Sequence, residues 1–89
     1  MTDALTRRLR EQIAERDRAI LDAANARLRL VAELKHHKKT EGMSFADPEQ
    51  EERLLSALEG ANGGPLSNEG VRALFSEILA LTKREIADD

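Results

Sequence analysis

Residues 3 to 39 contain neither glycine nor proline. Asp3 or Thr2 can cap the start of a helix there, and Gly42 follows its end. We therefore predict one helix of about 37 residues, roughly 55 Å long at 1.5 Å per residue. Such a helix constrains the 89-residue chain more than any other feature, because little sequence is left to cover it.

Capping residues predict two shorter helices after the long one. Asp47 and Pro48 suit the N-cap and N1 positions of the second helix, and Gln50 completes a capping box. Ser67 caps a third helix, whose apolar residues recur at helical spacing. These helices of about 13 and 20 residues span roughly 20 and 30 Å. They are too short to cover the long helix, so the fold class is all-α with an apolar stripe left over.

The long helix carries a heptad pattern in which apolar residues share the a and d positions with cations. An apolar stripe of this length would be exposed on an isolated chain. We therefore predict an intertwined homodimer whose long helices pack antiparallel about a two-fold axis. The a positions are Arg10, Asp17, Ala24, Val31 and Lys38, and the d positions are Ile13, Ile20, Arg27 and Leu34.

Three of these positions are basic, and unpaired cations are costly to bury. An antiparallel dimer centred near residue 22 would place the partner's Arg10 between Arg27 and Lys38. Three cations would then surround a pocket suited to a small dianion, with the arginines giving bidentate carboxylate recognition. The alternative is that these side chains reach solvent or pair with an acidic residue such as Asp17.

Three segments carry a family resemblance that covers nearly the whole chain. They are LREQIAERDRAILDAANARLRLVAELKHHKK, FADPEQEERLL and VRALFSEILALTKREI. Their order and spacing resemble those of the small all-helical chorismate mutases. The resemblance implies a single chorismate mutase-like helical domain over residues 1–89. It also implies an intertwined dimer of three-helix chains with shared active sites.

The resemblance implies roles for specific side chains. Arg10 from the partner chain and Arg27 would bind the two carboxylates of the substrate. Lys38 would lie at the ether oxygen and a carboxylate. Asp47 and Glu51 would hold the ring hydroxyl, although Asp47 has an alternative role as a helix cap alone. We therefore expect four catalytic residues and a substrate-binding role for Asp47. The four are Arg10, Arg27, Lys38 and Glu51.

Two further positions are implied on the third helix. Thr82 occupies a family position that holds a hydroxyl-bearing residue near a carboxylate. The family usually places Gln or Glu eleven residues after the aromatic that corresponds to Phe75, but this position is Ile86, which cannot hydrogen-bond the ether oxygen. We expect Lys83 and Glu85 to point elsewhere, because a helix turns by about 100° per residue.

The implied reaction is the pericyclic rearrangement of chorismate to prephenate in aromatic amino acid biosynthesis. This reaction needs no nucleophile, proton shuttle, metal or cofactor, so no cofactor is expected. Ile86 keeps two same-fold alternatives open, an aminodeoxychorismate mutase and an isochorismate-pyruvate lyase. It also keeps open a mutase that is weak without a partner enzyme of the shikimate pathway. The alternative of a different class is a non-catalytic regulatory helical dimer.

Composition argues against other classes of protein. The net charge is −3 and acidic residues follow the basic run at once, which disfavours nucleic-acid binding. His36 and His37 point about 100° apart on a helix and cannot chelate one metal ion. We interpret Lys35 and Lys39 as surface charges. No apolar run approaches membrane-spanning length, so a cytoplasmic protein that does not bind membranes is expected.

Overall fold

The computed structural model describes residues 3–43 and 47–86, and this part of the chain is helical with no strand. The helices are α1 (Ala4–Thr40), α2 (Pro48–Ala61) and α3 (Asn68–Glu85). The predicted number, order and approximate bounds of the helices are therefore confirmed. Thr2, the alternative cap of the first helix, lies outside the described residues.

The helix starts follow from the capping residues. Asp3, Asp47 and Ser67 are the N-caps, and each side chain accepts a hydrogen bond from a backbone N–H three residues later. Only one half of the predicted capping box forms at the second helix. The Gln50 side chain accepts hydrogen bonds from Arg53 instead of turning back to the cap, because the longer guanidinium reaches it from the next turn.

The end of α1 is a Schellman motif. The Met43 N–H donates to the Lys38 carbonyl at 2.8 Å, and the Gly42 N–H donates to the Lys39 carbonyl at 3.2 Å. Gly42 has φ of +72°, a conformation that L side chains rarely adopt. This glycine lets the chain reverse direction at the end of the long helix.

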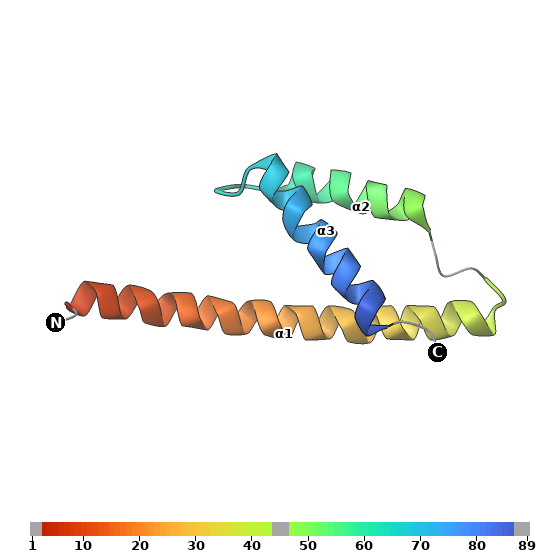
Figure 1. The fold of residues 1–89 in the computed structure, drawn as a ribbon, viewed down its shortest axis with the longest axis horizontal. Coiled ribbons are helices and arrows are strands. Elements are labelled where there is room, and N and C mark those ends of the chain that lie inside the picture. Colours follow the sequence, from red (N-terminus) through yellow and green to blue (C-terminus); the bar gives the residue numbers. More distant parts are fainter. Residues whose placement is uncertain (1–2, 44–46, 87–89) are drawn as a thin grey trace.

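α3 packs against both α1 and α2. Figure 1 shows α2 and α3 as a hairpin above the C-terminal half of α1, with the N-terminal half extending beyond them. The described residues measure 60 × 26 × 17 Å, and no described residue of α1 is buried. Large apolar side chains stay exposed along α1, namely Leu5, Leu9, Ile13, Ile20, Leu21, Leu30 and Leu34. A single chain therefore leaves the long helix largely uncovered.

The α2–α3 hairpin has a small apolar core and one ion-pair cluster. Leu55 and Val71 are its buried apolar residues. The Arg72 guanidinium contacts the Glu59 carboxylate and lies 2.7 Å from Oε1 of Glu52. These contacts join the first turns of α3 to α2.

Candidate active site

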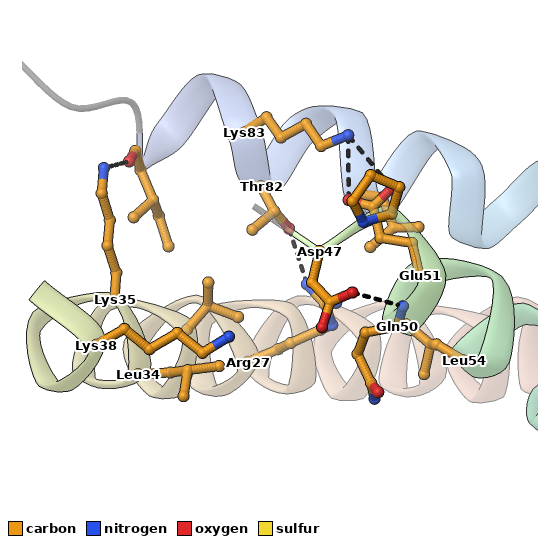
Figure 2. Close-up of a pocket in the computed structure, with 14 residues that line it drawn as sticks. Arg27, Leu34, Lys35, Lys38, Asp47, Gln50, Glu51, Leu54, Thr82 and Lys83 are labelled. Atoms are coloured by element: carbon orange, nitrogen blue, oxygen red, sulfur yellow. Dashed lines mark hydrogen bonds and ion pairs between the residues drawn. The ribbon is translucent and has the colours of Figure 1, made fainter. Parts of the chain in front are cut away.

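All three helices meet around one pocket of about 520 Å³. Figure 2 shows how the side chains of α1, α2 and α3 surround it. The lining combines apolar side chains with both signs of charge. Its residues are Arg27, Val31, Leu34, Lys35, Lys38, Asp47, Pro48, Gln50, Glu51, Leu54, Leu79, Thr82, Lys83 and Ile86.

Arg27 is held in the pocket by α3. Its Nη1 donates a hydrogen bond of 2.8 Å to the Thr82 hydroxyl, which itself donates to the Ile78 carbonyl at 2.6 Å. Thr82 is 8% exposed, so this polar chain lies in the packed contact between α1 and α3. The single hydroxyl proton of Thr82 is used on the backbone, and its oxygen orients the guanidinium. Among residues 3–43 and 47–86, Thr82 is the hydrogen-bond partner of Arg27, so the remaining N–H groups are available to a bound anion.

Lys38 contributes a second cation from α1. Its side chain extends along the helix in the direction of Arg27 (Figure 2). The pocket face of α1 therefore presents two positive groups about three helical turns apart. Within residues 3–43 and 47–86, the Lys38 ammonium has no hydrogen-bond or ion-pair partner, so it is available to a bound anion.

The acidic side of the pocket comes from the start of α2. Asp47 caps the helix, with its Oδ1 accepting from the Gln50 N–H at 3.1 Å, and it also lines the pocket. Glu51 lies one turn further along, with its Oε1 3.1 Å from the Lys83 ammonium. The two carboxylates thus line the same pocket as the cations of α1.

Two lysines contradict our interpretation of the sequence. Lys35 is not a simple surface charge: it lines the pocket, and its Nζ donates to the Ile86 carbonyl at 2.6 Å. Lys83 does not point elsewhere, because it lines the pocket and pairs with Glu51. The turn of about 100° between neighbouring residues was applied too strictly, because the pocket covers more than one position on each helix and a long side chain reaches round the helix. Glu85, by contrast, is not among the lining residues.

A spacing in the sequence could have revealed both lysines. Residues that share a helix face recur at i, i+3, i+4 and i+7. On α1 this series is Val31, Leu34, Lys35 and Lys38, and on α3 it is Leu79, Thr82, Lys83 and Ile86; all eight line the pocket. In both series the overlooked lysine stands at the i+4 position.

Arg10 lies outside the pocket of its own chain. It is exposed on α1, about 25 Å before Arg27 along the helix axis. Six of the seven side chains expected at the site are therefore brought together within one chain. Arg10 could join them only from a second chain.

Among the described residues, no three His, Asp or Glu side chains are grouped in a way that could hold a metal ion. None of the helices described here is both long and apolar enough to span a bilayer.

The fold and the site define an all-helical domain with a pocket lined by cations, carboxylates and apolar side chains. Residues 9–86 match the family described as chorismate mutase type II. A bifunctional chorismate mutase/prephenate dehydratase of Pseudomonas aeruginosa is 36% identical over 78 residues, which make up 88% of this chain. The match spans only 20% of that relative's length.

Solved structures are similar to this chain over most of both chains. Chorismate mutase form II of Thermus thermophilus matches with a TM-score of 0.85 and 33% identity, covering 93% of this chain and 97% of that one. Form I from the same organism matches with a TM-score of 0.83 and 34% identity, covering 85% and 95%. The chain therefore belongs to the chorismate mutase type II family.

Proposed function

We propose that this protein converts chorismate to prephenate in a pocket completed by a second copy of the chain. The observation that carries the proposal is the placement of Arg27 and Lys38 on one wall and Asp47 and Glu51 on another. A dianion with a ring hydroxyl presents the complementary groups. The pocket volume of about 520 Å³ is within the range of small-molecule sites.

Binding geometry accounts for one part of the rate. The reaction breaks an ether C–O bond and forms a C–C bond in one step, and it requires the compact conformer of the substrate. Arg27 and the partner's Arg10 would each hold one carboxylate in bidentate fashion. Asp47 and Glu51 would accept a hydrogen bond from the ring hydroxyl. Fixing the molecule at these points selects the reactive conformer.

Electrostatic stabilisation accounts for another part. Negative charge develops on the ether oxygen as its bond breaks, and Lys38 would donate to that oxygen. A preorganised donor of this kind contributes on the order of 3–4 kcal/mol to lowering the barrier. The proposed catalytic residues are thus Lys38, Arg27, the partner's Arg10 and Glu51.

A homodimer with antiparallel long helices is part of the proposal. Ile13, Ile20 and Leu34 occupy d positions of α1 and are 60%, 65% and 47% exposed in the single chain. A second copy of α1 running antiparallel would cover these side chains. The same pairing would bring the partner's Arg10 opposite the pocket, so one arrangement accounts for both the exposed stripe and the distant arginine.

The proposed pathway follows from membership of the chorismate mutase family. We propose that residues 1–89 act as a single catalytic domain in the cytoplasm, in the pathway to phenylalanine and tyrosine. We also propose that the protein docks to another shikimate-pathway enzyme. The pocket has Ile86 where the family usually has a polar side chain, so binding of a partner could raise a low activity.

The direct test is the loss of chorismate absorbance in the presence of the purified protein, with the product identified by its acid-catalysed conversion, because prephenate is an isomer of chorismate and has the same mass. Prephenate formation is the expected result. The control is Arg27→Ala, which should lower the rate by about a hundredfold or more. The absence of turnover, both alone and with shikimate-pathway enzymes added, would favour the non-catalytic helical dimer.

Ile86 favours a second candidate function on the same fold. Its apolar side chain lines the pocket where a polar group would hold the ether oxygen. In this case the protein would act on a modified chorismate, as an aminodeoxychorismate mutase or an isochorismate-pyruvate lyase. Comparing kcat/KM for chorismate, aminodeoxychorismate and isochorismate separates the candidates, and the highest value identifies the substrate.

A further inference from the structure

Lys83 forms an ion pair that joins two walls of the pocket. Its ammonium lies 3.1 Å from Oε1 and 3.4 Å from Oε2 of Glu51, so it contacts both carboxylate oxygens. Lys83 is in the last turn of α3, and Glu51 is in the first turn of α2. Figure 2 shows the lysine amine above the Glu51 carboxylate, on the side of the pocket away from Lys38. The pair therefore fixes the position of Glu51 from outside α2.

The Lys83–Glu51 pair affects the net charge of the pocket, and so the binding of an anion. The ionisable groups lining the pocket are four cations and two carboxylates, a net charge of +2. Without Lys83 the balance would fall to +1, and Glu51 would face an incoming dianion with its negative charge uncompensated. Like charges in one site repel each other, which weakens the binding of an anion.

We propose that Lys83 is a positioning residue that holds Glu51 and neutralises its charge, so that this carboxylate can accept a hydrogen bond from a dianionic substrate without repelling it. The inference rests on the proposed function and adds a residue to it. Lys83 acts through Glu51 and does not itself touch the substrate. Glu51 can then accept a hydrogen bond from the substrate hydroxyl, while the pocket keeps a positive net charge that attracts the two substrate carboxylates.

The mechanism predicts an effect on KM and not on kcat. Glu51 is neutralised equally in the ground state and the transition state, and such uniform binding changes KM alone. The pair is partly exposed, with 64% of the Lys83 side chain and 36% of the Glu51 side chain accessible. Exposed ion pairs make small contributions, so Lys83→Met should raise KM for chorismate by about two- to fivefold.

Arg84→Met is the matched control. Arg84 is also in the last turn of α3, so both variants lose one positive charge at the same helix end. Arg84 does not line the pocket, and its replacement should leave KM unchanged. Lys83→Arg keeps the charge and the reach, and it should restore the wild-type KM. Equal KM values for Lys83→Met and wild type, or for Lys83→Met and Arg84→Met, would overturn the proposal.

A double-mutant cycle tests whether Lys83 acts through Glu51. With Glu51→Gln as background, the carboxylate is no longer charged, so Lys83→Met should leave KM within about 1.5-fold of the single variant. An undiminished two- to fivefold increase in that background would show that Lys83 contacts the substrate directly, and would overturn the positioning role. Turnover by the wild-type protein is measured first, so failure of the proposed function would be seen separately in the wild type.

Discussion

The Arg27 guanidinium donates a 2.8 Å hydrogen bond to the Thr82 hydroxyl, which joins α1 to α3 across 55 residues of sequence. Thr82 is anchored in turn by its own hydrogen bond to the Ile78 carbonyl. The orientation of a cation in the pocket is therefore set by a buried side chain of another helix. An arginine held in this way has fewer rotamers to lose when an anion binds.

Replacing Thr82 with Val should lower kcat/KM by at least about tenfold. Valine has nearly the same shape as threonine but offers no oxygen to Arg27. A hydrogen bond to a charged group contributes about 1.5–3 kcal/mol, which is the scale of this loss. Steady-state kinetics with chorismate measures the effect, and thermal unfolding of the same sample shows whether the fold is retained.

Thr82→Ser is the control for this prediction. Serine keeps the hydroxyl that accepts from Arg27 and loses only a methyl group, so kcat/KM should stay within about threefold of the wild type. An equally large loss in the serine and valine variants would indicate that packing around the methyl group matters, and not the orientation of the guanidinium.

Complementation between Arg10→Ala and Arg27→Ala tests the shared site. Each variant alone should lose about a hundredfold or more in activity, because every site lacks one arginine. A heterodimer of the two carries both changes in one site and neither in the other. Random reassociation of an equal mixture gives about half heterodimers, so about a quarter of wild-type activity should return.

The readout for complementation is activity after the mixed variants are unfolded and refolded together, compared with variants refolded separately. Recovery only in the co-refolded sample supports an arginine supplied by the partner. If both variants dimerise by light scattering and mixing restores no activity, the antiparallel pairing is incorrect.

Replacing Ile86 with Gln should raise kcat by about tenfold, because the amide adds a donor for the developing charge on the ether oxygen. The backbone already holds this residue in place: its N–H donates to the Thr82 carbonyl at 2.9 Å, and its carbonyl accepts from Lys35. Ile86→Leu keeps the wall apolar and should leave kcat unchanged. The same kcat for the Gln and Leu variants would mean that residue 86 does not reach the ether oxygen.

Local signals made the helices predictable from sequence. Asp47 and Ser67 cap helices through contacts three residues away, and Gly42 supplies a positive φ at the end of α1. Each of these signals is contained within one turn of the chain. The partner of Gln50 was not predictable in the same way, because Arg53 competed with the backbone for the same amide oxygen.

The pocket was predictable where heptad position and family motif coincide, as at Arg27 and Lys38. Helical spacing could have placed Lys35 and Lys83 on the pocket face, but it does not predict their partners on another helix. Lys83 reaches the pocket because Glu51 attracts it from α2, and Lys35 turns toward the Ile86 carbonyl because α3 ends there. These contacts depend on the tertiary arrangement, which the charge pattern of a single helix does not contain.

The α2–α3 hairpin should lose stability in acid through Glu52. Hydrogen bonds from the Arg72 guanidinium, followed by its charge, lower the pKa of Glu52 from its ordinary value of 4.5. A carboxylate with a lowered folded-state pKa stabilises the fold above its ordinary pKa, and this contribution disappears as the pH falls through the folded value. The free energy of unfolding should therefore decrease below about pH 4.5.

Arg72→Met isolates this contribution from other carboxylates. The pKa of Asp3 is also lowered, because its carboxylate accepts a hydrogen bond from the Thr6 backbone, and this effect is common to both proteins. The difference in unfolding free energy between wild type and Arg72→Met, measured by urea denaturation, should be largest above pH 4.5 and shrink toward pH 3. Arg29→Met, an exposed change on α1, should show no such trend. A wild-type advantage over Arg72→Met that stays constant from pH 7 to about pH 3 would exclude Glu52 as its source.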